Sequence, residues 1–346
     1  MTVSSNSLGS PSALTGSSYS TARPPDEIVL STHALTKRYG ERLAVDALSL
    51  QMRRGDVFGF LGPNGAGKTT TIRMCLGLIA PTSGSVSILG QRVAREGARV
   101  LPRVGALVEQ PALYPYLSGR ENLRVVGDAL GGVSNSRIDA VLALVGLSGR
   151  ERDRVRTYSL GMKQRLGLAM ALLHEPELVI LDEPANGLDP AGIVEMRDLL
   201  RRLAASGITV FLSSHVLAEV RQICTRVAIV NRGRLVTEAS IDELTAGSGE
   251  YVVAVDRPAE ALALLRAQPW GATARMTDDG RIVTGAPEGG SAALNLFLVH
   301  AGFAPGAIGE QRHDLEDVFL RLTQSDGSPA GNATTTDTAS ARGGAR

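Results

Sequence analysis

From residue 27 onward, apolar positions recur with two different spacings. Short, almost wholly apolar runs at residues 56–61 and 178–181 are typical of strands buried on both faces of a sheet. Longer stretches at residues 161–173 and 193–204 have apolar positions three or four apart, which is typical of helices with one buried face. Because such strands and helices alternate along the chain, the pattern predicts an α/β fold with a largely parallel sheet and helices on both faces.

The same two spacings predict the other elements of this region. Further strands are expected at residues 28–35, 43–52, 86–89, 104–108, 209–212, 227–231 and 234–238. Further helices are expected at residues 69–79, 121–129, 137–145 and 216–223. Two of these helices fall in residues 116–158, which we interpret as a helical insertion in the α/β domain.

Composition divides the chain into domains and tails. Residues 1–26 and 325–346 are rich in small and polar residues and predict disordered tails, because they hold too little apolar surface to form a core. Small residues at 246–250 predict a linker between a first domain, residues 27–245, and a second, residues 250–324. The second domain contains no chemical motif. Its pattern predicts a small α+β fold, with strands at residues 251–255, 273–276 and 281–284 and helices at 258–267, 292–301 and 315–322.

Charge and apolar content exclude several classes of protein. The 36 basic and 35 acidic residues leave a net charge of +1, which gives no electrostatic case for a nucleic-acid partner. No apolar run approaches the roughly 20 residues that cross a bilayer, and the first residues do not resemble a secretion signal. We therefore expect a cytoplasmic protein, in which Cys75 and Cys224 are buried free thiols.

Lysine is rare in this chain. Only Lys37, Lys68 and Lys163 occur among the 36 basic residues, and the others are arginine. A biased codon pool is the simplest explanation, but the scarcity makes each lysine a candidate for a specific role.

A glycine-rich segment follows the apolar run at residues 56–61. It matches G-x-x-x-x-G-K-[ST] at every fixed position, with a predicted strand before it and a helix after it. Its glycines allow backbone N–H groups to turn toward phosphate oxygens, and the helix N-terminus adds partial positive charge. Lys68 is expected to reach the β- and γ-phosphates of ATP, and the Thr69 hydroxyl to bind Mg²⁺. The predicted phosphate-binding residues are Gly62, Pro63, Asn64, Gly65, Ala66, Gly67, Lys68, Thr69 and Thr70.

Two carboxylates, Asp182 and Glu183, end the apolar run at residues 178–181. In a phosphate-loop fold, an acid at the end of such a strand lies beside the phosphate loop. Asp182 is therefore expected to bind Mg²⁺ and Glu183 to act as general base on the attacking water.

Residues 158–165, read Y-S-L-G-M-K-Q-R, identify the kind of ATPase. This segment resembles the signature of the ABC family, commonly L-S-G-G-Q followed by a basic residue and Q-R, in the form of its drug and bacteriocin export branch. Ser159 and Gly161 are kept, whereas Leu160 and Met162 replace the first glycine and the glutamine. The resemblance implies that Ser159–Met162 bind the γ-phosphate of ATP held by a second subunit.

Other segments resemble the remaining motifs of the family in order. Residues 186–190 resemble the D-loop, which places Asp189 at the dimer interface, and His215 resembles the switch histidine that contacts the γ-phosphate. Tyr39 resembles the aromatic residue that stacks on adenine. One position departs from the family, because Glu109 stands where the Q-loop glutamine is usual. A carboxylate there is expected to approach Mg²⁺ or the attacking water.

The resemblance implies an ATP-binding and hydrolysing subunit that drives transport through a separate membrane permease. It covers residues 28–244, and the simplest assembly is a homodimer on the cytoplasmic face of the cell membrane. Export of a drug, antibiotic or peptide is expected by resemblance, from the form of residues 158–162, the stretch 111–122 and the second domain, which resembles the accessory domain of drug-export ATPases. An importer ATPase, a soluble ABC ATPase not tied to transport and a non-hydrolysing regulatory protein are the alternatives.

Overall fold

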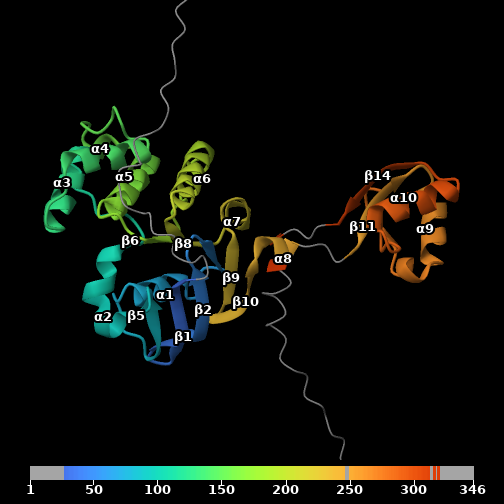
Figure 1. Ribbon diagram of the computed structural model, residues 1–346, viewed down its shortest axis with the longest axis horizontal. Helices are drawn as coiled ribbons and strands as arrows, with labels where there is room; N and C mark the ends of the chain where they lie inside the picture. The colour runs from blue at the N-terminus through green and yellow to red at the C-terminus, as the bar shows by residue number, and fades with distance from the viewer. Residues whose placement is uncertain (1–26, 246–248, 312–314, 317, 320–346) are drawn as a thin grey trace, which may run out of the picture.

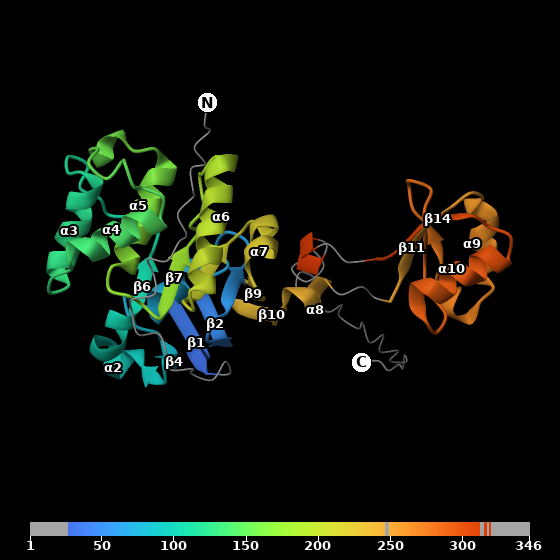
Figure 2. The same ribbon diagram turned by 45° about the horizontal axis from the view of Figure 1, so that its top comes forward.

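The computed structural model describes residues 27–245, 249–311, 315, 316, 318 and 319 (Figure 1). Residues 27–245, which we call the first domain, and residues 249–311, which we call the second, stand apart in both views (Figures 1 and 2). The predicted tails lie outside the described residues.

A six-stranded sheet forms the centre of the first domain. Its strand order is β10-β9-β3-β8-β7-β6, and every neighbouring pair is parallel except β10 with β9. The predicted parallel sheet is therefore confirmed. Its strands are β3 (Val57–Leu61), β6 (Val104–Leu107), β7 (Leu178–Asp182), β8 (Thr209–Ser214), β9 (Arg226–Asn231) and β10 (Arg234–Ser240).

Both faces of this sheet are buried, because successive side chains of each strand point to opposite sides. On β7, Val179 and Leu181 join one apolar core, whereas Leu178 and Ile180 join the other. This explains why the strand reads as a continuous apolar run. The same alternation decides to which side of the sheet Asp182, the last residue of β7, points.

Helices cover one face of the sheet. Three of them, α3, α4 and α5, gather at the end of the first domain farthest from the second domain (Figure 1). This group contains the predicted helical insertion. The helices of this face are α3 (Gly119–Ala129), α4 (Asn135–Leu144), α5 (Leu160–Leu172), α6 (Pro190–Ala205) and α7 (Leu217–Ile223), with the short 3₁₀ helix η2 (Val155–Thr157) before α5.

A separate antiparallel sheet packs with the other core. Its order is β2-β1-β4-β5, so the strands predicted at residues 28–35, 43–52 and 86–89 lie outside the parallel sheet. A helix at residues 93–100 was not predicted. The elements on this side are β1 (Ile28–Tyr39), β2 (Arg42–Arg53), β4 (Ser83–Ile88), β5 (Gln91–Arg92), α1 (Lys68–Cys75), α2 (Val93–Val100) and η1 (Leu101–Arg103).

The second domain has its own small core beneath a four-stranded antiparallel sheet of order β12-β13-β11-β14. The strand β14 was not predicted. After α8 (Ile241–Thr245) come β11 (Tyr251–Val255), α9 (Pro258–Arg266), η3 (Pro269–Gly271), β12 (Arg275–Met276), β13 (Ile282–Thr284), α10 (Gly290–His300) and β14 (Pro305–Glu310).

The last described residues return to the first domain. Leu315 is buried beside Leu217 and Ala218 of α7, and Phe319 packs against the core under the helices. The stretch predicted as the final helix of the second domain therefore contacts the first, where its described residues bury their apolar side chains.

Two simpler expectations can be checked directly. Cys75 and Cys224 are free and buried, as predicted, and burial raises the pKa of the Cys75 thiol to about 12. None of the helices in the described residues is long and apolar enough to span a membrane.

Candidate functional site

The phosphate loop joins the end of β3 to the start of α1. Gly67 precedes the helix with φ of +101°, in the left-handed region that favours glycine. A Cβ atom at Gly67 would lie 2.5 Å from the Ala44 carbonyl oxygen, and one at Gly62 would lie 2.5 Å from that of Val230. These close backbone approaches explain why the loop needs glycine at both positions, independently of any ligand.

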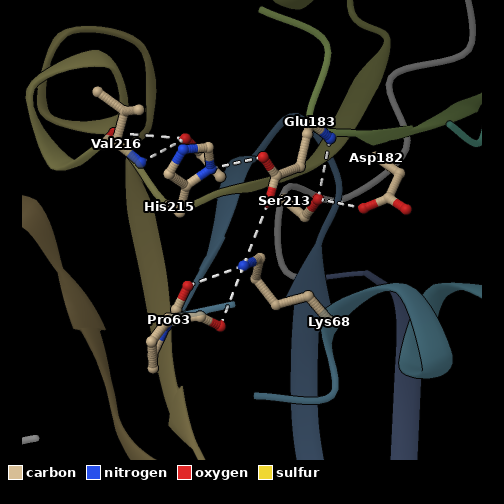
Figure 3. Close-up of polar contacts among 9 residues, drawn as sticks. Pro63, Lys68, Asp182, Glu183, Ser213, His215 and Val216 are labelled. Atoms are coloured by element: carbon tan, nitrogen blue, oxygen red, sulfur yellow. Dashed lines mark hydrogen bonds and ion pairs between the residues drawn. The ribbon is translucent and has the colours of Figure 1, made fainter. Parts of the chain in front are cut away.

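Lys68 is buried and folds back over the loop. Its Nζ donates a hydrogen bond of 2.8 Å to the Gly62 carbonyl oxygen and lies 3.4 Å from that of Pro63 (Figure 3). The same Nζ lies 3.2 Å from Oε1 of Glu183. The ammonium therefore stands at the junction of the two motifs that were predicted from the sequence. The small hollow there, of about 150 Å³, is lined by Arg42, Ala44, Asn64, Gly65, Gly67, Lys68, Thr69, Thr70 and Glu183.

Glu183 connects three elements. It follows the last residue of β7 with φ of +50°, which is uncommon for a residue with a side chain. Its Oε1 pairs with Lys68, while its Oε2 accepts a 2.5 Å hydrogen bond from Nδ1 of His215, just after β8 (Figure 3). The structure therefore brings the predicted lysine, general base and switch histidine into one chain of contacts.

Ser213 links Asp182 to the backbone of Glu183. β7 and β8 pair in parallel with Asp182 opposite Ser213. The Ser213 hydroxyl donates to Oδ1 of Asp182 at 2.5 Å and accepts a 3.0 Å hydrogen bond from the backbone N–H of Glu183. This serine fixes the Asp182 carboxylate and the strained backbone of Glu183 together. Sequence reasoning missed its role, although its place in Ser-Ser-His before α7 was a signal.

The donor set suits magnesium bound together with a nucleotide. Asp182 is 4% exposed, and within the described residues its one hydrogen-bonded side-chain partner is Ser213. The described chain has no cluster of three or more His, Cys, Asp or Glu residues placed to hold a metal. Mg²⁺ commonly takes one or two protein oxygens and completes its shell with phosphates and water, so Asp182 and the Thr69 hydroxyl fit that use.

A cavity of about 400 Å³ lies behind Glu183 and His215, between α6 and α7. Its lining is mainly apolar and includes Leu188, Met196 and Leu212, together with the carboxyl group of Glu219. Burial raises the pKa of Glu219 above its ordinary value, against the attraction of His215. Glu183 and His215 therefore border a space with a mainly apolar lining.

Glu109 lies away from this group of contacts. It follows β6, with φ of +60°, and its Oε1 forms a 2.5 Å ion pair with the guanidinium of Arg73 on α1. The Glu109 side chain is 61% exposed and the Arg73 side chain 40% exposed. The structure therefore does not bring Glu109 to Asp182 or Thr69 in this state, and the pairing with Arg73 was not expected from the sequence.

The predicted signature forms the start of α5. Ser159 caps this helix, since its hydroxyl accepts a 3.2 Å hydrogen bond from the Met162 N–H. Leu160 lies close to Gly187, and Gly161 close to Leu188, so the signature and the predicted D-loop are neighbours in one chain. In that loop, Asp189 caps α6 through a 3.0 Å hydrogen bond from the Gly192 N–H.

Tyr39 ends β1 and is 48% exposed. Its ring lies beneath the ammonium of Lys37, 5.0 Å from the ring centroid. A half-exposed aromatic ring can stack on a flat ligand such as a nucleotide base.

Comparisons with known proteins agree on one family. The family described as ABC transporter matches residues 45–186. The chain is 42% identical to the bacitracin transport ATP-binding protein BcrA of Bacillus licheniformis over 85% of this chain and 97% of that protein. It is 48% identical to the ABC transporter ATP-binding protein YhcH of Bacillus subtilis over 68% of this chain and 78% of that one.

A solved structure supports the same relationship. The structure described as an ATP binding subunit of an ABC transporter aligns with a TM-score of 0.56 and 31% identity. It covers 62% of this chain and 91% of the solved one.

Proposed function

The chain belongs to the ATP-binding proteins of ABC transporters, and from this premise we propose how its site works and what it serves. It is an ATP-binding subunit and an ATPase. The observation that carries the proposal is the position of the Glu183 carboxylate, between the ammonium of Lys68 and the imidazole of His215.

Binding of ATP changes the groups that contact the Lys68 ammonium. Phosphate oxygens replace the carboxylate and the loop carbonyl groups around the ammonium, because a triphosphate carries more negative charge than Glu183. Glu183 is then free to accept a proton from the attacking water as general base. His215 keeps contact with Glu183 through Nδ1, and with both ring nitrogens protonated its Nε2 donates to the γ-phosphate.

The Thr69 hydroxyl and the Asp182 carboxylate would hold Mg²⁺ when nucleotide is bound. Mg²⁺ held there would supply positive charge beside the phosphate oxygens. Glu109 reaches the same sheet edge only after it leaves Arg73, so its approach to the ion or the water depends on a rearrangement of the segment after β6.

Two copies of the chain complete each site. The free N–H groups at the start of α5, near Ser159 and Gly161, bind the γ-phosphate held by the other copy, with Asp189 at the interface. Closure around ATP drives a separate membrane permease. A homodimer on the cytoplasmic face of the cell membrane is the simplest assembly.

The transported molecule is a drug, antibiotic or peptide that leaves the cell. The support is the similarity to a bacitracin transport ATP-binding protein across 85% of the chain, including the second domain. The permease recognises the substrate. ATP-driven accumulation of bacitracin in inverted membrane vesicles, from cells that express the chain with its permease, tests the direction. Uptake by right-side-out vesicles alone would instead indicate import.

The mechanism is tested on the purified full chain by phosphate release and by light scattering with ATP. Glu183→Gln is expected to lower hydrolysis by at least about 100-fold, because a positioned general base is lost. The variant is also expected to accumulate as an ATP-bound dimer. Glu288→Gln, an exposed site in the second domain, is the matched control and keeps wild-type turnover.

Two outcomes contradict the proposal. Unchanged hydrolysis by Glu183→Gln moves the general base to another residue. Failure of both proteins to bind ATP, measured by calorimetry, removes the assigned phosphate site itself.

A further inference from the structure

Lys37 is one of only three lysines in the chain, and the mechanism above does not use it. It lies on β1 two residues before Tyr39 and is partly buried. Residues two apart on a strand project to the same face, so the two side chains are neighbours.

The ammonium of Lys37 contacts two groups, a backbone carbonyl and an aromatic ring. Its Nζ donates a 2.7 Å hydrogen bond to the Ala80 carbonyl oxygen and lies 5.0 Å from the centroid of the Tyr39 ring. No carboxylate forms an ion pair with Lys37 in the described part of the chain. Its positive charge is therefore directed at a carbonyl oxygen and at the negative face of an aromatic ring.

Hydrogen bonds of the neighbouring residues stabilise this position of Lys37. The Arg38 N–H donates to the Thr82 hydroxyl at 3.0 Å, and the Thr82 N–H donates to the Thr36 carbonyl oxygen at 2.8 Å. These bonds join the end of β1 to the segment that carries Ala80. The Tyr39 ring itself belongs to none of the apolar cores, so its neighbours on β1 and the Lys37 charge are what orient it.

We propose that Lys37 is a positioning residue for the nucleotide base: its ammonium covers one face of the Tyr39 ring and presents the other face to adenine. The inference rests on the proposed function, because it needs Tyr39 to contact the base. A flexible half-exposed ring loses conformational freedom when a base stacks on it. A ring already held by a cation loses less, and the base binds more tightly.

The test compares two ligands on the full chain by calorimetry: ATP, and inorganic triphosphate, which has no base. Lys37→Met keeps the aliphatic stem and removes the charge. It is expected to weaken ATP binding about two- to fivefold, the size of an exposed cation–π contact, and to leave triphosphate binding unchanged. The KM for ATP is expected to rise by the same factor at constant kcat, and Lys37→Arg to restore wild-type values.

Two controls accompany this variant. Arg38→Met removes the same charge one residue away, where the guanidinium contacts the Glu41 carbonyl oxygen instead, and should change neither ligand. In a Tyr39→Ala background, Lys37→Met is expected to have no effect on ATP. Circular dichroism checks that each variant folds.

The possible failures are distinguishable. Tighter ATP binding by Lys37→Met would mean that the ammonium blocks the face that the base needs, and equal weakening of both ligands would mean that it acts on phosphate. Either result overturns the inference. If Tyr39→Ala binds ATP as tightly as the wild type does, the stacking role in the proposed function fails, whatever Lys37 does.

Discussion

Glu183 and Glu109 are both held in a backbone conformation that glutamate rarely adopts. Their φ angles are +50° and +60°, a conformation that costs roughly 1–2 kcal/mol for a residue with a Cβ atom. Each is held by a side chain from another element: Ser213 accepts from the Glu183 N–H, and Arg73 pairs with the Glu109 carboxylate. Such conformations often mark functional positions.

Glu109→Gln tests whether this position, rather than Gln110, serves the Q-loop role. Loss of the charge is expected to lower ATP turnover about tenfold, the equivalent of one charge-assisted hydrogen bond lost in the transition state. Gln110→Ala is expected to keep wild-type turnover. Phosphate release measures both. The reverse pattern would show that the motif is shifted by one residue.

Glu177 illustrates a residue whose charge stabilises the fold. It precedes β7, is 18% exposed, and contacts Arg54 at 3.0 Å and Arg103 through Nε at 2.6 Å. Burial tends to raise the pKa of Glu177, but hydrogen bonds from Arg103 and Arg54 outweigh it and hold the pKa below its ordinary value of 4.5. The stabilisation is therefore present at neutral pH and is lost as pH falls through the lowered pKa.

Glu177→Gln is expected to reduce the free energy of unfolding at pH 7 by about 1–3 kcal/mol, because charged hydrogen bonds to two arginines are weakened. Urea denaturation at pH 7 and at decreasing pH measures the difference from the wild type. That difference should shrink below pH 4.5, where the wild-type carboxylate takes up its proton. A constant difference at every pH would assign the effect to packing.

At the scale of elements, two helices begin with the same chemistry in different places. Ser159 caps α5 in the predicted signature, while Ser118 caps α3 in a capping box with Glu121. Each hydroxyl accepts a 3.2 Å hydrogen bond from a backbone N–H of the first turn. Comparing variants of Ser159 and Ser118 can therefore separate the stabilising effect of a helix cap from a role in binding ATP.

Ser159→Ala and Ser118→Ala are each expected to lower stability by about 1 kcal/mol, the usual value of an N-cap side chain. Only Ser159→Ala is expected to reduce ATP turnover and ATP-dependent dimerisation as well. Thermal unfolding and phosphate release measure the two effects. Equal turnover in both variants would limit Ser159 to capping its helix.

The two elements that the sequence did not predict, α2 and β14, have different causes. α2 is short and contains Glu96 with non-helical angles, φ −124° and ψ 19°, next to Gly97, so its helical geometry is interrupted. β14 contains Pro305, Gly306 and Gly309, residues that disfavour strands, and it exists because it pairs with β11 some 50 residues earlier. Buried strands such as β3 and β7 were predictable because burial on both faces demands apolar residues throughout.

At the scale of the whole molecule, the division into two domains is a prediction. The fluorescence of a single tryptophan can test it. Trp270 is the only tryptophan of the chain and packs edge-to-face on Phe297 in the second domain, 5.2 Å between ring centroids. Its fluorescence therefore follows the unfolding of that domain alone. The first domain contributes most of the far-ultraviolet circular dichroism, because it holds most of the helices and strands.

Leu298→Ala empties a fully buried position in the second core and is expected to cost that domain about 2–5 kcal/mol. The tryptophan transition in urea should move to lower concentration, while ATP hydrolysis without denaturant stays at the wild-type rate. Leu200→Ala, equally buried in the first domain, is the matched control and should move only the circular dichroism transition. One common transition shifted by both variants would contradict independent domains.

The sequence by itself determined the chemistry of the site and the order of the elements that carry it. The phosphate loop needs glycines where backbone approaches backbone, and Asp182 and Glu183 end a strand whose apolar run is visible in one dimension. These motifs lie within short segments, so they can be recognised before the fold is known.

Only the tertiary structure decided which side chains meet. The pairing of β7 with β8 places Ser213 beside Asp182 and brings His215 to one oxygen of Glu183. The pairing of β3 with β8 brings the loop that carries Lys68 to the other oxygen. The pairing of Glu109 with Arg73, and the return of Leu315 to the first domain, were also decided there. Such contacts join residues distant in the chain, and their geometry depends on how sheets and helices pack, which no single segment encodes.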